Sequence, residues 1–175
     1  VDCYNLQPLI YAYGQQNIAI SGKGIIDGQG SNENWWFMKG RKEYGWKPGL
    51  LSQEEGGRAK LLDYDQRCVP VEERIMTLED ALRPQLINFY KCKNVLIEDV
   101  ELRNSPFWVI HPLMVENMIV RRVRIDSHGP NSDRCDPESS RNILIEDCFF
   151  DTGDDCIAIK SGRNHHVNNM GGIIE

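Results

Sequence analysis

The chain has 175 residues, of which 41% are hydrophobic, and it carries a formal net charge of -6 at pH 7. This length and composition predict one folded domain, and the acidic balance disfavours a nucleic-acid-binding protein, because the phosphate backbone attracts basic surfaces. It contains no run of 18 apolar residues, so no membrane span is expected. The six cysteines form no Cys-x-x-Cys pair, and we expect most of them to be small buried side chains.

A phrase that begins with asparagine and continues with branched apolar residues recurs along the chain. Its asparagines are Asn17, Asn94, Asn117 and Asn142, and the last three are separated by 23 and 25 residues. The apolar runs alternate as strands do, and two or three short strands fit one period. Stacked units of this kind predict an all-β solenoid, a parallel β-helix. A β-sandwich would not need the phrase at this interval, and a doubly wound α/β fold would need amphipathic helices, which residues 94–160 lack.

Residues 29–85 interrupt this repeat. We expect a single β-helix domain over residues 1–175, with a long, partly helical excursion at 29–85 (the excursion). Within it, residues 71–82 have the composition of a short helix that would end before Pro84, because proline stops a helix at the preceding residue.

Two acidic clusters lie about one repeat apart. Asp133 precedes Asp154 by 21 residues, and Asp155 follows directly. We expect all three carboxylates on one outward face of adjacent coils, with a bend at Gly153 that lets both members of the pair point outward. Mutual repulsion should raise at least one pKa, which gives a proton donor beside ionised bases and suits cleavage of glycosidic bonds. A calcium-binding or structural role is the alternative, for which further carboxylates are available.

Several phrases of the chain resemble glycoside hydrolase family 28, the polygalacturonases and their pectin-degrading relatives. They are residues 17–30 (NIAISGKGIIDGQG), 104–108 (NSPFW), 131–133 (NSD) and 153–162 (GDDCIAIKSG). The resemblance covers nearly the whole chain and is strongest over residues 83–164.

This resemblance implies a right-handed parallel β-helix that hydrolyses α-galacturonide linkages with inversion and without a metal or organic cofactor. It implies that Asp154 is the general acid and that Asp133 and Asp155 activate the water. The expected partner is pectin or a galacturonide oligosaccharide, with no nucleic acid and no membrane, and the expected location is secreted or periplasmic.

Three residues near the acidic clusters are candidates for substrate binding: Asn131, Lys160 and Arg163. An anionic polymer on an acidic protein needs local cations, and the arginine fork suits carboxylates. The alternative for Lys160 and Arg163 is ordinary pairing with nearby acids.

The chain also departs from the family pattern. Asp133 is followed by Arg134 where the family has glycine, and this cation could lower a neighbouring pKa or obstruct the cleft. The family's Gly-His-Gly and Arg-Ile-Lys segments are not found, and Met170 occupies the place of the histidine. Two alternatives therefore stay open, a non-catalytic β-helix that binds acidic polysaccharide and a lyase on the same architecture.

The ends of the chain support one further expectation. The chain opens at Val1 without an initiator methionine and stops at Glu175, so we expect a fragment that is incomplete at both ends. A solenoid that lacks terminal caps could self-associate through its exposed ends.

Overall fold

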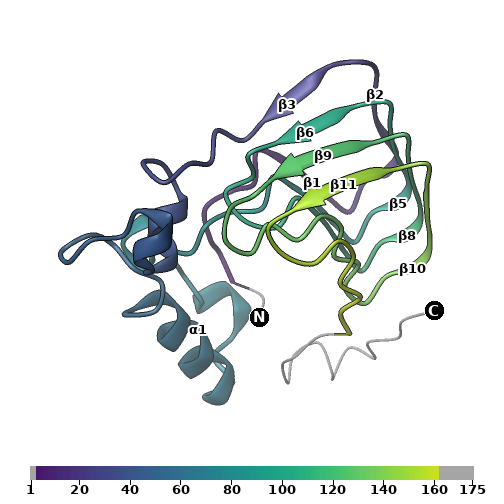
Figure 1. The fold of residues 1–175 in the computed structure, drawn as a ribbon. Helices are drawn as coiled ribbons and strands as arrows, with labels where there is room; N and C mark the ends of the chain where they lie inside the picture. Colours follow the sequence, from purple (N-terminus) through teal and green to yellow (C-terminus); the bar gives the residue numbers. More distant parts are fainter. Residues whose placement is uncertain (1–2, 162–175) are drawn as a thin grey trace.

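The computed structural model describes residues 3–161 and shows a right-handed parallel β-helix with the excursion packed on one side (Figure 1). The strands are β1 (Ile10–Tyr13), β2 (Gln16–Ser21), β3 (Ile25–Asp27), β4 (Ile87–Tyr90), β5 (Lys93–Glu98), β6 (Glu101–Arg103), β7 (Ile110–Leu113), β8 (Glu116–Arg121), β9 (Arg124–Ser127), β10 (Arg141–Glu146) and β11 (Phe149–Thr152). They form three sheets, ordered β1-β4-β7, β10-β8-β5-β2 and β11-β9-β6-β3, and every strand pair is parallel. The predicted fold class is confirmed.

Each coil of the solenoid contributes one strand to each sheet. Ile87 in β4 pairs with Ile110 in β7, and Val95 in β5 pairs with Met118 in β8. In the next coil the first sheet continues as isolated bridges, because Cys135 pairs with both Ile110 and Ile157. Residues about one coil apart in sequence therefore lie side by side on the same face.

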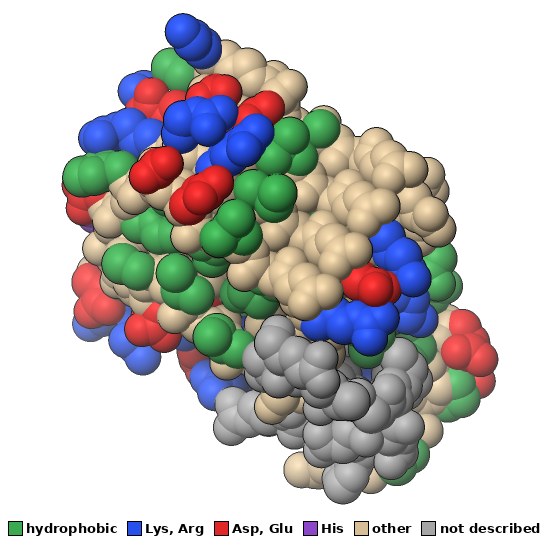
Figure 2. Space-filling view, turned by 90° about the vertical axis from the view of Figure 1, so that its right-hand side faces the viewer, with side chains coloured by type: hydrophobic (Ala, Val, Ile, Leu, Met, Phe, Trp, Pro, Cys, Tyr) green, Lys and Arg blue, Asp and Glu red, His purple; other side chains and the backbone are tan. Residues whose placement is uncertain are grey.

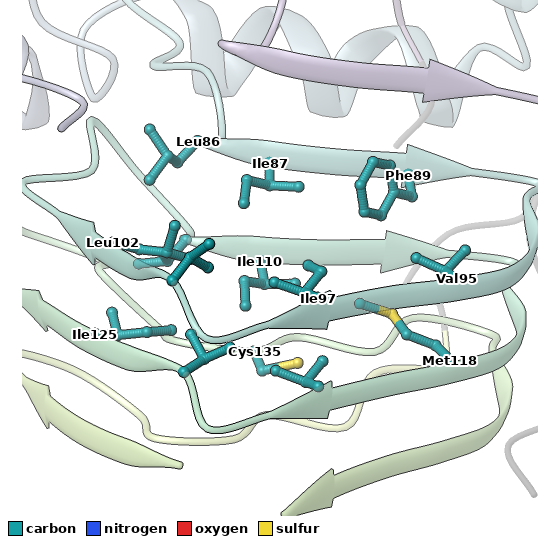
Figure 3. Close-up of a cluster of buried hydrophobic side chains, with 14 of the residues drawn as sticks. Leu86, Ile87, Phe89, Val95, Ile97, Leu102, Ile110, Met118, Ile125 and Cys135 are labelled. Atoms are coloured by element: carbon teal, nitrogen blue, oxygen red, sulfur yellow. The ribbon is translucent and has the colours of Figure 1, made fainter. Parts of the chain in front are cut away.

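The interior of the coils is apolar and closely filled. In β5, Val95 and Ile97 are buried while the residues between and before them are more exposed, which is the two-residue alternation of a strand. Ile97 lies in register between Ile20 and Val120 of the adjacent coils. Figure 3 shows such side chains from successive coils pointing toward one another. Burial of this stack is the main source of stability for the solenoid.

The repeated asparagines form a ladder at one corner of the coils. Asn17, Asn94, Asn117 and Asn142 all have φ between 55° and 60°. The amides of Asn94, Asn117 and Asn142 each donate to the asparagine of the preceding coil, at 2.9 Å, 3.1 Å and 2.9 Å. Asparagine tolerates this left-handed conformation better than most residues, which explains its return at the start of every phrase.

Ion pairs link adjacent coils on the side of the molecule that carries the sheet β10-β8-β5-β2. Glu116 lies 2.9 Å from both Lys93 and Arg141, on the coils before and after it. The space-filling view of this side shows basic side chains directly beside acidic ones (Figure 2). Charges of opposite sign therefore alternate from coil to coil, so that like charges do not lie directly opposite each other on adjacent strands.

The helical part of the excursion differs from the prediction. The α-helix α1 covers Gly57–Gln66, and the other helical elements are 3-10 turns, η1 (Trp36–Lys39), η2 (Lys42–Tyr44), η3 (Val71–Glu73) and η4 (Leu78–Asp80). The helix expected over residues 71–82 is wrong.

Two features interrupt residues 71–82, one bridge and one left-handed residue. Ile75 forms a bridge with Tyr4, which holds the chain extended after η3. Ala81, with φ 54°, ends η4 after a single turn. Helix propensity in residues 71–82 therefore yields to pairing with the amino-terminal segment.

The excursion docks on the loops that follow β6 and β9. The indole Nε1 of Trp36 donates to the carbonyl of Ser105 at 2.9 Å. Gly129 makes room for this ring, because a Cβ at that position would lie 2.3 Å from Trp36 Nε1. The loop after β9 contains Asp133, and the loop after β6 lies next to it on the preceding coil, so the excursion lies beside these residues.

The cysteines differ in burial, and the helices are short. Cys92 and Cys135 are buried, but Cys68 and Cys156 are exposed, so the expectation of mostly buried cysteines holds for only part of the set. In residues 3–161, no helix has the length and apolar character needed to cross a membrane.

Candidate active site

The acidic residues gather on the face of the sheet β1-β4-β7, where its rungs continue beyond β7. The bridge between Cys135 and Ile157, together with the hydrogen bond from Arg134 N to Asp155 O at 3.1 Å, places Asp155 opposite Asp133 on the next coil. The coil repeat thus brings Asp133 and Asp155 side by side, as the spacing predicts. Trp108 lies opposite Asp133 on the preceding coil, by the same register.

The three carboxylates differ in exposure. Asp154 and Asp155 are exposed, whereas Asp133 has only 6% of its surface open to solvent. The expectation that all three face water is therefore wrong for Asp133, whose carboxylate pairs with Lys160 at 3.3 Å. One buried carboxyl group thus lies next to two solvated ones.

The bend at Gly153 sets the direction of the acid pair. β11 ends at Thr152, and the chain bends at Gly153 and Asp154, so both aspartates reach solvent as predicted. A Cβ at Gly153 would lie 2.9 Å from the carbonyl oxygen of His128, so only glycine fits there without a shift. The hydroxyl of Thr152 accepts a hydrogen bond from Asp154 N at 2.9 Å and donates to Ser132 O at 3.1 Å. The turn is therefore fastened to the loop that carries Asp133.

A second buried aspartate accompanies Asp133. Asp136 is fully buried, and burial, followed by the charge of Asp133, raises its pKa to about 7. Burial also raises the pKa of Asp133; the charge of Asp154 adds to this rise and the Lys160 ammonium opposes it. Burial thus favours the protonated form of both carboxyl groups, and the Lys160 ammonium favours the ionised form.

Lys160 connects these groups. Its Nζ lies 3.3 Å from Asp133 and 2.9 Å from Asp136, and 4.4 Å from the centre of the Trp108 ring. The ammonium is thus engaged with carboxylates of the protein, which is the alternative to the expected contact with substrate. Its charge favours the ionised form of both aspartates.

Asn131 adjoins the exposed acid pair. Its Nδ2 lies 3.5 Å from Asp154 Oδ2, and its Oδ1 accepts a hydrogen bond from Arg83 at 3.0 Å. Its role in substrate binding stays a prediction. Arg163 lies outside the described residues.

Arg134 does not obstruct the face. Its side chain is fully buried, and its guanidinium donates to the carbonyls of Ser127 and Ser132 at 2.8 Å and 2.7 Å. Burial lowers its pKa to about 10. The cation that follows Asp133 in the sequence therefore points inward and braces the loop around Asp133.

Sequence reasoning did not assign a site role to several polar residues on this face. His111 Nε2 lies 3.0 Å from Glu138 Oε2, and its Nδ1 lies 3.1 Å from the amide of Asn88. Asp136 could have been found from its spacing, three residues after Asp133, but its burial gives no signal in the sequence. The role of Arg83 depends on how the excursion docks, which no local pattern reveals.

No group of three or more His, Cys, Asp or Glu side chains suited to a metal ion occurs among residues 3–161. The buried Asp133 and the solvated Asp154 and Asp155 give this face carboxyl groups in unlike environments, as acid–base catalysis requires.

Comparison with known proteins places this arrangement in a family. Residues 74–172, more than half of the chain, match the model of Glycosyl hydrolases family 28. The chain belongs to glycosyl hydrolase family 28. The resemblance inferred from the sequence is thereby confirmed.

Relatives and solved structures of this family are similar over most of the chain. A probable polygalacturonase of Vitis vinifera is 30% identical over 161 residues, which are 90% of this chain and 25% of the relative. The crystal structure of a hyperthermoactive exopolygalacturonase from Thermotoga maritima has a TM-score of 0.93 and 49% identity, over 96% of this chain and 38% of that one. The polygalacturonase of Erwinia carotovora has a TM-score of 0.61 and 25% identity, over 93% of this chain and 39% of that one. The chain spans about a quarter of the length of the curated relatives.

Proposed function

We propose that the full-length gene product carrying this chain hydrolyses α-galacturonide linkages of pectin with inversion. The observation that carries the proposal is the register that sets Asp133 opposite Asp155 on adjacent coils, with Asp154 beside them. Inverting cleavage needs one carboxylic acid for the leaving oxygen and a carboxylate base for water on the other face of the sugar. Membership of family 28 supports the substrate class.

Asp154 is proposed as the general acid, and Asp133 and Asp155 as the groups that hold and deprotonate the water. Asp154 lies exposed at the bend after β11, where an oxygen of a polymer can approach it. Burial raises the pKa of Asp133, and a base becomes a stronger proton acceptor as its pKa approaches the working pH. The Lys160 ammonium, 3.3 Å away, favours the ionised form that a base needs.

The decisive experiment uses Asp154→Asn and Asp133→Asn in the full-length gene product. Each should lower kcat on galacturonide oligomers by about 10²–10⁴-fold, the usual contribution of a general acid or base. On an aryl galacturonide, whose leaving group needs little protonation, Asp154→Asn should recover most of its activity while Asp133→Asn should not.

The matched control for this experiment is Asp151→Asn. Asp151 is an exposed carboxylate of β11 that lies 3.6 Å from His128, and its loss should leave turnover within about twofold. Near-normal turnover by Asp154→Asn would reject the assignment. Binding of oligomers without release of reducing ends by the wild type would favour the alternative of a non-catalytic polysaccharide-binding protein.

We also propose attack from the chain end. Support comes from the 49% identity with the protein named as an exopolygalacturonase of Thermotoga maritima. The expected products from a defined oligomer are short units released from one end, with a slow fall in the viscosity of polymeric substrate. A rapid fall in viscosity would indicate internal cleavage instead.

A polymeric pectin substrate also implies a location outside the cytoplasm, and we propose that the gene product is secreted or periplasmic. Fractionation of the source cells with an antibody against the solenoid would test this, and a purely cytoplasmic signal would reject it.

A further inference from the structure

Arg83 of the excursion is buried at the point where three parts of the chain meet. Only 3% of its surface is exposed. Its Nη1 donates to the carbonyls of Pro106 and Pro130, at 3.0 Å and 2.6 Å, and its Nη2 donates to Asn131 Oδ1 at 3.0 Å. One guanidinium therefore ties the excursion to the loop after β6 and to the loop that leads into Asp133.

All hydrogen-bond partners described for this guanidinium are neutral. Nη2 also lies 3.4 Å from Gln53 Oε1, and the cation rests 5.1 Å from the centre of the Phe107 ring. No ion pair to Arg83 occurs within residues 3–161, and burial lowers its pKa to about 10. A buried cation without a carboxylate partner is costly to folding. Its bond to Asn131, which adjoins Asp154, suggests a role beyond stability.

The contact with Asn131 fixes which way its amide points. Arginine has donors and no acceptor, so it can only bond the oxygen of the asparagine amide. With the oxygen held by Arg83, the amide nitrogen must point the other way, where Asp154 Oδ2 lies at 3.5 Å. Asn131 also has a left-handed backbone, with φ 55°, a conformation that asparagine tolerates better than most residues.

We propose that Arg83 is a positioning residue of the reaction, which orients the Asn131 amide so that its N–H is directed at Asp154. The excursion would then act on the acid–base chemistry of the solenoid through one hydrogen-bond relay, Arg83 to Asn131 to Asp154. This rests on the proposed function, in which Asp154 is the proton donor.

The test compares Arg83→Lys, Asn131→Ala and the double variant in the full-length gene product. Lysine keeps the charge but cannot bridge these carbonyls and the amide as the planar fork does. Arg83→Lys should lower kcat about 10-fold with KM changed less than about threefold, since it removes alignment rather than binding. In the Asn131→Ala background the same change should cost almost nothing in kcat, because the relay is already broken.

Arg74→Lys is the matched control. Arg74 is another arginine of the excursion with 3% of its surface exposed, and its Nε donates to Val69 O at 2.7 Å. It should lose stability while kcat stays within about twofold of the wild type. An equal loss of kcat in Arg74→Lys at equal stability, or an equal effect of Arg83→Lys in both backgrounds, would show that Arg83 acts through stability alone and overturn the proposal.

Asn131→Asp covers the case in which Arg83→Lys does not fold. The aspartate keeps an acceptor for Arg83, and gives it a charged one, but offers Asp154 no donor. We expect unchanged or higher thermal stability together with a loss of kcat as large as that of Asn131→Ala, a combination that a merely structural role would not produce. Normal kcat in Asn131→Asp would overturn the relay.

The same assays separate the two proposals. No turnover by the wild type overturns both. Wild-type turnover that Asp154→Asn abolishes and Arg83→Lys leaves unchanged overturns only the relay.

Discussion

The solenoid and the excursion are built on different principles, although they meet at one face. In the solenoid each coil repeats the last, so a residue in β5 has its neighbours one coil away at the same register position in β2 and β8. In the excursion no such rule holds, and its contacts, such as Trp36 with Ser105, join residues 69 positions apart without a period. Asp133, Asp154 and Asp155 belong to the solenoid. Arg83, whose bond to Asn131 directs that amide at Asp154, belongs to the excursion.

The sharpest test of this difference is the loss of a large apolar side chain from each region, one buried in the coils and one on the surface of the excursion. Ile97→Ala opens a cavity at a fully buried position between Ile20 and Val120 and should destabilise the protein by about 3 kcal/mol. Leu62→Ala in α1, at a position that is 44% exposed, should cost no more than about 0.5 kcal/mol. Urea unfolding followed by far-ultraviolet circular dichroism measures both. Equal losses would contradict the view that stability resides in the repeated interior.

The sequence predicts the solenoid better than it predicts the excursion. The asparagine phrases predict coil stacking because each asparagine occupies the same left-handed corner, and the 21-residue interval therefore brings Asp133 next to the acid pair. The burial of Asp133 was not predictable, since its partner Lys160 lies 27 residues later, on the next coil. The helix was misplaced because Ile75 pairs with Tyr4, more than 70 residues earlier in the chain. Arg83 gave no signal because its partners are carbonyls and amides of distant loops.

The next largest effect concerns the buried side chain of Asp136, and it depends on pH. The folded pKa of Asp136 is raised to about 7, mainly by burial, while an unfolded aspartate titrates near about 3.9. Its contribution to the free energy of unfolding is therefore complete below pH about 4 and is lost as pH rises through about 7. Asp136→Asn removes this titration, so the stability of the wild type relative to the variant should fall by about 3 kcal/mol from pH 4 to pH 7.

Glu138→Gln is the control with opposite sign. Burial alone would raise the pKa of Glu138, but its hydrogen bond with His111 and the charge of that group outweigh burial and lower it. Its contribution is present above the ordinary glutamate pKa and is lost as pH falls, so wild type relative to Glu138→Gln should gain stability with rising pH. Parallel pH profiles for the two variants would show that at least one of the two carboxyl groups does not behave as its surroundings imply.

The smallest expected effect probes the docking of the excursion itself. Gly129→Ala adds a methyl group 2.3 Å from Trp36 Nε1, and the ring must move because it cannot share that space. We expect a loss of about 1 kcal/mol, at the low end for overpacking, because the excursion can shift away while the coils keep their register. Gly24→Ala is the matched control, since a Cβ there would meet nothing within 4 Å.

The two glycine variants should differ in where they act. In Gly129→Ala, proteolysis should increase within residues 29–85 while the circular dichroism of the solenoid is unchanged, whereas Gly24→Ala should resemble the wild type in both. If the docked excursion supports the relay from Arg83 to Asn131, kcat should fall with the proteolytic protection. Loss of protection with full kcat would mean that the coils alone arrange the carboxylates, and the excursion would then contribute nothing to the chemistry of this face.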